Sequence, residues 1–141
     1  KKGGKTERVK VTDEEIAAKK AAEKAYVPYS GFTVGAALLT KDGKVYSGCN
    51  IENASYSPTN CAERTAFFKA VSEGERDFAA IAIVGGKEKN FTEYCSPCGV
   101  CRQVMAEFCN KDFRIILGKN DNDYKTYTLA ELLPESFSLK E

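Results

Sequence analysis

Two short segments combine residues that can bind a metal ion with one that can move a proton. Cys61 is followed two positions later by Glu63, and a Pro-Cys-x-x-Cys segment further along the chain holds Cys98 and Cys101. Catalytic zinc sites usually have three protein ligands and keep a fourth position for water, whereas structural sites are closed by a fourth ligand. The three thiols fit the open type, with one zinc ion per chain. Glu63 is then a catalytic carboxylate near the ion, placed to move protons between water and a substrate.

Both cysteine segments are expected at the start of a helix. Residues 61–71 and 98–109 show the apolar spacing of helices, and the polar loop before Cys61 offers good N-cap residues. Cys98 and Cys101 are three residues apart and therefore share a helix face. The positive end of a helix dipole favours the thiolate form that binds metal. Two helix starts are therefore predicted to converge on one ion.

Charged residues near these cysteines have two interpretations. Three thiolates around one Zn²⁺ leave a net negative charge, and Arg64 and Arg102 are candidates to offset it by hydrogen bonding the sulfurs. The alternative is that both are ordinary surface arginines of helices. The chain has no histidine, so acid/base chemistry falls to a carboxylate, Lys, Tyr or Cys.

The six cysteines allow other interpretations as well. A disulfide framework is disfavoured because Cys95, Cys98 and Cys101 are clustered. A Cys-x-x-Cys segment alone is also typical of redox dithiols, but a dithiol does not require the Cys61 segment. Cys95 could supply a fourth thiolate and close the site as a structural one, which would leave Glu63 unexplained.

Length and charge limit the possible partners. The chain of 141 residues has the size of one domain, and its 21 Lys and Arg against 20 Asp and Glu disfavour a nucleic-acid partner. Without a membrane-length apolar run or the apolar core of a signal peptide, we expect a cytoplasmic protein with no membrane partner. Residues 1–10 are expected to be a disordered terminus or a remnant of cloning, and residues 11–141 a single domain.

The remaining patterns predict an α/β fold. Residues 78–84 are almost wholly apolar, which is typical of a central strand covered on both faces. Asp42-Gly43 lies between two strand-like runs and predicts a hairpin. The last two strands are too close in sequence for a parallel crossover, so they are antiparallel if adjacent. The predicted helices span 13–26, 61–71, 98–109 and 128–133, and the predicted strands span 33–40, 44–51, 78–84, 113–117 and 125–128.

Further segments extend the pattern beyond the cysteines. They are Tyr29-Ser30-Gly31-Phe32, 34–39, 48–54, 61–66, 96–103 and 131–134. Together these segments resemble the small, homotetrameric cytidine deaminases, and the resemblance runs from about residue 25 to residue 137. It implies hydrolytic deamination of cytidine and 2′-deoxycytidine in pyrimidine salvage, at the zinc site described above.

The resemblance also implies substrate contacts. In that family the counterparts of Asn50 and Glu52 bind ribose hydroxyls, and the counterpart of Phe32 packs on the pyrimidine. Asn50 and Glu52 alternate along a strand end, so their side chains point to one side and offer donor and acceptor groups to a sugar. The implied substrate-binding residues also include Ala54, Tyr56 and Phe137, the last two reaching into a neighbouring subunit of a homotetramer.

The combined prediction is a three-layer α/β/α domain with a mixed five-stranded sheet, its last two strands antiparallel, that deaminates a nucleoside. One rival within the fold is a deaminase of a modified cytosine nucleoside such as blasticidin S. A second rival is a polynucleotide editor, against which the balanced charge counts. A rival from another class is a non-enzymatic zinc-binding interaction module, which a closed four-cysteine site would imply.

Overall fold

One mixed sheet of six strands runs through the molecule. The computed structural model describes residues 5–8, 13–120 and 123–140. The elements in chain order are β1 (Lys5–Arg8), α1 (Asp13–Ala22), β2 (Phe32–Thr40), β3 (Val45–Cys49), α2 (Ala62–Ser72), β4 (Phe78–Lys87), α3 (Gly99–Phe108), β5 (Arg114–Gly118), β6 (Asp123–Thr128) and α4 (Leu129–Leu132). The strand order is β1-β6-β5-β4-β2-β3, with β4 and β5 parallel and the other neighbours antiparallel. The predicted mixed sheet and antiparallel last pair are confirmed.

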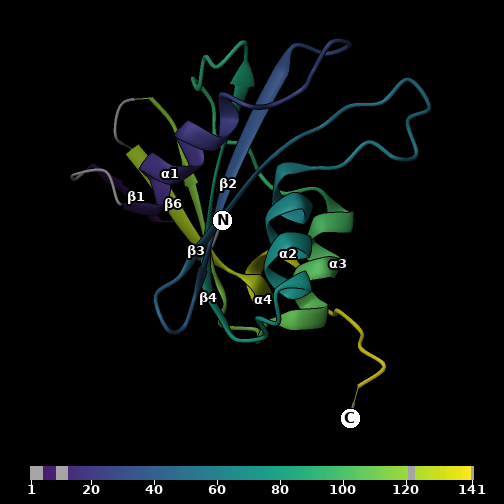
Figure 1. Ribbon diagram of the computed structural model, residues 1–141. Helices are drawn as coiled ribbons and strands as arrows, with labels where there is room; N and C mark the ends of the chain where they lie inside the picture. The colour runs from purple at the N-terminus through teal and green to yellow at the C-terminus, as the bar shows by residue number, and fades with distance from the viewer. Residues whose placement is uncertain (1–4, 9–12, 121–122, 141) are drawn as a thin grey trace.

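Helices cover both faces of this sheet and give three layers (Figure 1). On one face, α1 packs through small side chains, among them Ala18 and Ala22, against alanines of β2 and β4. On the other face lie α2, α3 and α4, over a second and larger cluster of buried side chains. The strand β4 lies inside the sheet and is buried along nearly its whole length, as predicted for residues 78–84. The three-layer prediction is therefore confirmed.

The strand β1 corrects the prediction of a disordered terminus for residues 1–10. Lys5–Arg8 pairs antiparallel with β6, with Lys5 opposite Thr126 and Arg8 opposite Asp123. Four polar residues without apolar alternation give no strand signal, and their partner lies near the other end of the chain. The sheet therefore has one strand more than predicted. The prediction for residues 1–4 and 9–10 falls outside the described residues.

The connections near the site follow local signals, with one exception. Asp42-Gly43 forms the predicted β2–β3 turn, with Gly43 at φ +95° and the Thr40 amide donating to the Lys44 carbonyl at 2.9 Å. The exception is α1, which ends at Ala22 and not at residue 26. After α1 the chain runs alongside the residues that follow β3, and the Tyr26 amide donates to the Asn50 carbonyl at 3.0 Å.

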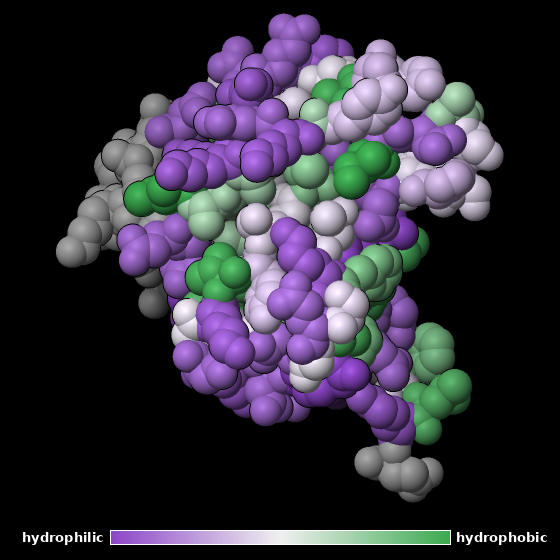
Figure 2. Space-filling model, viewed as in Figure 1, coloured by the Kyte–Doolittle hydropathy of each residue, from purple (hydrophilic) through white to green (hydrophobic). Residues whose placement is uncertain are grey.

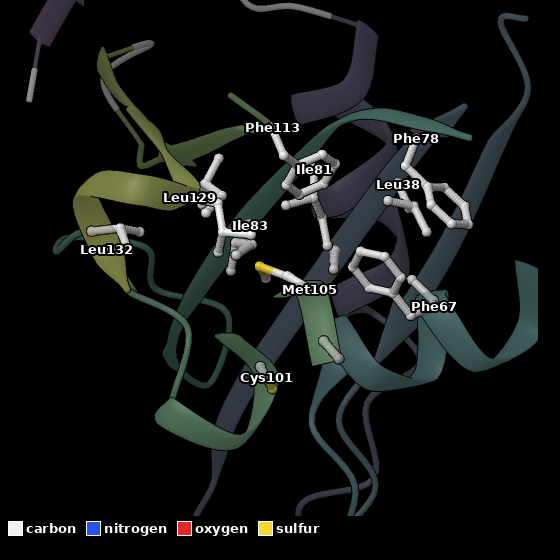
Figure 3. Close-up of a cluster of buried hydrophobic side chains, with 14 of the residues drawn as sticks. Leu38, Phe67, Phe78, Ile81, Ile83, Cys101, Met105, Phe113, Leu129 and Leu132 are labelled. Carbon is white, nitrogen blue, oxygen red and sulfur yellow. The ribbon is translucent and has the colours of Figure 1, made fainter. Parts of the chain in front are cut away.

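Large apolar side chains fill the space between the sheet and the helices α2 to α4 (Figure 3). The ring of Phe67 on α2 meets that of Phe78 on β4 edge to face, with centroids 5.2 Å apart. Met105 and Cys101, one turn apart on α3, are buried in the same cluster. The first turn of α3 is thus anchored in the core, which fixes the position of one predicted zinc ligand.

The surface seen in Figure 2 is mostly hydrophilic, with single hydrophobic side chains scattered over it. The C-terminal tail differs, because its hydrophobic side chains stand away from the body at the lower right. Phe137 on this tail is 68% exposed. Among the described residues, no helix has the length and apolar character needed to cross a membrane.

Candidate active site

The three predicted metal ligands meet at the starts of α2 and α3. Cys61 is the N-cap of α2 and Cys98 that of α3, both with extended backbone. The Sγ atoms of Cys61 and Cys98 are 3.8 Å apart, and those of Cys98 and Cys101 are 3.4 Å apart. All three sulfurs lie within 4.8 Å of one another. The predicted convergence of two helix starts is confirmed.

This arrangement fits a tetrahedral zinc ion. Zn–S bonds of about 2.3 Å at tetrahedral angles place sulfurs roughly 3.8 Å apart. The observed separations, from 3.4 Å to at most 4.8 Å, bracket that value. Cys61 and Cys98 also line a cavity of about 130 Å³, which leaves room for a fourth ligand that is not a side chain. The three cysteines therefore suit an open zinc site.

A glycine on β3 allows α2 to approach the sheet closely enough to form this site. A Cβ atom added to Gly48 would lie 2.5 Å from the carbonyl oxygen of Ala62 and 2.6 Å from the amide nitrogen of Ala66. Neither backbone atom can move without displacing the helix. The absence of a side chain at Gly48 thus sets the position of the first turn of α2, which carries Cys61 and Glu63.

Arg64 compensates the charge of the sulfurs. Its Nη2 donates to Cys61 Sγ at 3.1 Å. The pKa of Cys61 is lowered to about 5, first by a hydrogen bond from the Cys101 thiol and then by the one from Arg64. Because the Cys101 thiol donates its proton to Cys61, the pKa of Cys101 is raised well above its ordinary range. Burial disfavours the charged guanidinium, but its hydrogen bonds to the sulfurs outweigh burial and raise the pKa of Arg64. The predicted contact of Arg64 with a ligand is present.

Arg102 has a different role from the one predicted. Its Nε donates to the Pro97 carbonyl at 2.8 Å, and its Nη1 donates to the Leu132 carbonyl at 2.6 Å. Within the described part of the chain, its guanidinium therefore binds carbonyl oxygens and not a sulfur. Arg102 ties the loop before Cys98 to the end of α4, so it supports the ligands through the backbone.

Glu63 lies inside the cavity beside the sulfurs. Its side chain is on the first turn of α2 and is only 4% exposed. Burial raises the pKa of Glu63 to about 7, and the negative charge of Cys61 adds to this effect. A carboxyl with a pKa near neutrality can both accept and donate a proton under physiological conditions. Glu63 therefore has the placement and the acidity expected of the proton carrier.

Cys95 lines the same cavity without joining the sulfur cluster. The group of possible metal ligands among the described residues consists of the other three cysteines. The Cys95 sulfur packs toward β4, where a Cβ atom added to Gly85 would lie 2.7 Å from it. Burial raises the pKa of Cys95 to about 12, so this side chain stays a neutral thiol. This geometry favours the open site with three thiolates over a closed site with four.

Asn50 connects the cavity wall to the start of β2. Its Oδ1 accepts from the Val34 amide at 2.9 Å, and its Nδ2 donates to the Phe32 carbonyl at 2.8 Å. Val34 and Ser96 also line the cavity; both lie in segments that match the family, but neither was predicted as a site residue. Phe32 begins β2, is 40% exposed and lines a different cavity, together with Gly85 and Tyr94. The structure thus joins two of the predicted substrate residues directly.

Glu52 lies two residues beyond Asn50 and is bound by a loop. Its Oε1 accepts from the amides of Tyr29 and Ser30, at 3.0 Å and 3.2 Å, and its Oε2 accepts from the Ser30 hydroxyl. These hydrogen bonds, the Ser30 hydroxyl first, lower the pKa of Glu52 and keep it a carboxylate. Ser30 was missed as a functional candidate, although its segment matched the family.

Asn50 is the predicted substrate residue that lines the cavity, and besides Phe32 and Glu52 three more of these residues lie outside it. Ala54 and Tyr56 are on the long loop between β3 and α2, and Tyr56 is 81% exposed with φ of +60°. Phe137 lies on the C-terminal tail near Cys109 and Leu129, residues that do not line the cavity. The placement of these side chains fits a role toward another molecule better than one in their own cavity.

Comparisons with known proteins agree with this site. A family model described as "Cytidine and deoxycytidylate deaminase zinc-binding region" matches residues 13–117. A cytidine deaminase of Sporosarcina psychrophila is 58% identical over 123 residues, which cover 87% of this chain and 88% of that protein. A blasticidin-S deaminase of Bacillus cereus is 34% identical over 109 residues, which cover 74% of this chain and 76% of that protein.

A solved structure gives the same result. The cytidine deaminase from Burkholderia pseudomallei matches with a TM-score of 0.81 at 50% identity, over 88% of this chain and 96% of that one. The match to the family model includes all three clustered cysteines and the buried glutamate beside them. The chain therefore belongs to the cytidine deaminase family of zinc-dependent hydrolases.

Proposed function

We propose that this protein catalyses the hydrolytic deamination of cytidine and 2′-deoxycytidine to uridine and 2′-deoxyuridine, with release of ammonia, in pyrimidine salvage. The observation that carries the proposal is the buried carboxyl of Glu63 in a cavity lined by two of three clustered thiols. The relatives named cytidine deaminase support the substrate class. One zinc ion per chain, held by Cys61, Cys98 and Cys101, is part of the proposal.

The reaction needs one carboxyl that moves protons between three atoms. Water adds to C4 of the cytosine ring, N3 gains a proton, and the amino group leaves as ammonia. Zinc, when bound, supplies a water molecule whose pKa is lowered toward neutrality. Glu63 accepts the proton of the attacking water and donates it to N3. It then transfers the proton of the new C4 hydroxyl to the amino nitrogen, which allows the C4–N bond to break.

The surroundings of Glu63 suit this role. Its side chain is nearly excluded from solvent, so bulk water does not compete for the proton that it holds. In the zinc-free chain burial raises the pKa of Glu63 to about 7, so both protonation states of the carboxyl are accessible near neutral pH. Arg64 donates to a sulfur, so it lies close enough to balance negative charge during turnover.

Asn50 and Glu52 are proposed to bind the sugar. Asn50 lines the cavity, and Glu52 follows it on the loop after β3 with an ionised carboxylate that accepts hydrogen bonds. Phe32, which receives a hydrogen bond from Asn50, would pack on the pyrimidine. Because Asn50 binds the backbone of β2, the sugar site and the base site are fixed relative to each other.

One assay tests the main proposal. The fall in ultraviolet absorbance of cytidine is followed with purified protein, with and without a chelator, and with Glu63→Gln as the control for catalysis. We expect conversion to uridine by the wild type, loss of activity after chelation and recovery on adding Zn²⁺. A protein that holds zinc but converts neither cytidine nor 2′-deoxycytidine would refute the proposal.

The rival substrates are separated in the same assay. The likeness to a blasticidin-S deaminase keeps that antibiotic as the second candidate substrate. The balanced charge gives no support for binding a polynucleotide. We expect free cytidine to be deaminated at a higher kcat/KM than either blasticidin S or a cytosine-containing oligonucleotide, and the opposite order would identify the rival.

The rival without catalysis is less well supported by the geometry. A structural module requires a closed metal site, but Cys95 lies outside the sulfur cluster. A module would also give no reason to bury Glu63, since burial of an ionisable carboxyl disfavours its charged form and destabilises the fold near and above neutral pH. An active enzyme in the cytidine assay would exclude this alternative.

The active form is proposed to be a homotetramer in which Tyr56 and Phe137 reach a neighbouring site. Both aromatic rings are largely exposed in the single chain, where they would cost free energy unless another surface covers them. We expect Phe137→Ala to raise the KM for cytidine while zinc content stays at one per chain. Sedimentation of a fully active monomer would overturn the proposal.

A further inference from the structure

The carboxylate of Glu52 has little hydrogen-bonding capacity left for a ligand. An ionised carboxylate offers about four lone-pair positions. Oε1 accepts two amides, those of Tyr29 and Ser30, and Oε2 accepts the Ser30 hydroxyl. One position on Oε2 is left, and its direction is set by the three bonds already made. Whatever Glu52 binds must therefore approach that position.

The Ser30 hydroxyl also connects Glu52 with Phe32. A hydroxyl can donate one hydrogen bond and accept others at the same time. Ser30 Oγ donates to Glu52 Oε2 and accepts from the Phe32 amide at 3.0 Å. One side chain thus joins the residue proposed to bind the sugar with the residue proposed to pack on the base.

The loop that carries Ser30 is itself held in place from both sides. The Gly31 amide donates to the Val27 carbonyl at 3.0 Å, and Gly31 adopts φ of +68°, which glycine reaches without strain. From the end of β4, the Glu88 amide donates to the Gly31 carbonyl at 2.8 Å and Lys87 Nζ donates to the Ser30 carbonyl at 3.1 Å. The hydroxyl is therefore presented by a backbone with little freedom to turn away.

From this network we infer that Ser30 is a positioning residue, which aims the free lone pair of Glu52 at one sugar hydroxyl. The inference rests on the proposed function, because it assigns Glu52 to the sugar. Ser30 itself need not touch the substrate. Its contribution is to keep Glu52 ionised and in a single orientation, so that less ordering is needed on binding.

The test is Ser30→Ala, compared on two substrates. The side chain is exposed, so its removal should leave the fold intact. We expect the KM for cytidine to rise about tenfold, the size of one hydrogen bond to a charged group, with kcat within about threefold of the wild type. For 2′,3′-dideoxycytidine, which lacks both hydroxyls that Glu52 could bind, the KM should change by less than about threefold, because Asn50 still holds the Phe32 carbonyl.

Two further variants serve as controls. Ser30→Thr keeps the hydroxyl and should restore the KM for cytidine to within about threefold of the wild type. Ser72→Ala removes another exposed serine, whose hydroxyl bonds the Lys69 carbonyl on α2, and should leave KM unchanged for both substrates. An equal loss on both substrates with Ser30→Ala, or no loss on either, would overturn the inference.

A second readout does not depend on catalysis. Loss of the Ser30 hydroxyl should raise the pKa of the Glu52 carboxyl toward its usual value, measured by ¹³C NMR and assigned with Glu52→Gln. An unchanged pKa would refute the positioning role even in an enzyme of unexpected specificity. If the pKa rises but Glu52→Gln leaves the KM for cytidine unchanged, then Ser30 positions Glu52 and the proposed sugar contact is what fails.

Discussion

Replacing Glu63 by glutamine should stabilise the zinc-free protein at alkaline pH while it abolishes turnover. The carboxyl is 4% exposed in a small cavity, where its charged form loses hydration. Glutamine has nearly the same shape and carries no charge. The substitution therefore removes the cost of a buried charge without opening a cavity.

The magnitude follows from the pKa of Glu63, which burial raises from the usual 4.5 to about 7. Below pH 4.5 the carboxyl is protonated in both the folded and the unfolded chain. As the pH rises from 4.5 to 7, the unfolded chain releases this proton while the folded chain still holds it, so stability falls. The pKa values differ by about 2.5, which at about 1.36 kcal/mol per pKa unit amounts to about 3 kcal/mol above pH 7.

The assay is urea unfolding of both proteins after chelation in a reducing buffer, at pH 5 and at pH 8.5. We expect the free energy of unfolding of Glu63→Gln to exceed that of the wild type by about 2–3 kcal/mol more at pH 8.5 than at pH 5. Glu73→Gln, at an exposed position, should change by less than about 0.5 kcal/mol at either pH. Equal differences at the two pH values would show that the Glu63 carboxyl is not held neutral by burial.

Whereas the stability of Glu63→Gln should rise, the turnover of the zinc-loaded variant should fall. An amide cannot accept the proton of the attacking water. General acid/base groups contribute roughly 10²- to 10⁴-fold, so kcat should fall by at least about 10²-fold while the zinc content stays the same. A variant that is more stable and inactive would mean that the fold tolerates a destabilising group because the reaction needs it. Activity above about a tenth of the wild type would show that another group carries the proton.

Three other substitutions test the metal site and its support. Cys101→Ala should release the zinc ion, whereas Cys95→Ala should retain it, as measured by elemental analysis; equal losses would favour a closed site with four thiolates. Gly48→Ala should lower both the free energy of unfolding and the zinc occupancy, because its new Cβ would lie 2.5 Å from the carbonyl oxygen of Ala62. Full zinc occupancy in this variant would show that α2 can shift. Met105→Ala should lower the free energy of unfolding by about 2–5 kcal/mol, and a loss under about 1 kcal/mol would mean that the core closes around the gap.

Most of the fold could be predicted because its signals are local. The Asp42-Gly43 turn, the apolar run of β4 and the spacing of α2 and α3 each depend on residues within about ten positions. β1 could not be predicted in this way, because Lys5–Arg8 is polar and pairs with a strand near the other end of the chain. The early end of α1 has a similar cause, since Tyr26 is held by the backbone of Asn50.

The metal site could be predicted for a related reason. Cys98 and Cys101 are on one helical turn, and Cys61 and Glu63 are on the first turn of another, so each helix start fixes its ligands without reference to the rest of the fold. The convergence of the two helices depends on the one sheet face against which both pack, and three thiolates at two helix starts are compatible with few arrangements other than a shared tetrahedral ion. Cys95, which obeys the same spacing on the other side of Pro97, shows the limit of this reasoning.

The sugar site depends on contacts that no spacing rule describes. Ser30 and Glu52 are on separate loops, and the hydrogen bond between them becomes visible only when β2 and β3 have paired. The Asn50 side chain likewise forms two hydrogen bonds with the backbone of β2, so the residue proposed to bind the substrate also holds the fold together at this point. A substitution at Asn50 would therefore change the position of Phe32 together with the contact to the sugar. For this reason a variant of Ser30, which leaves the Asn50 contacts in place, separates positioning from binding more cleanly than a variant of Asn50.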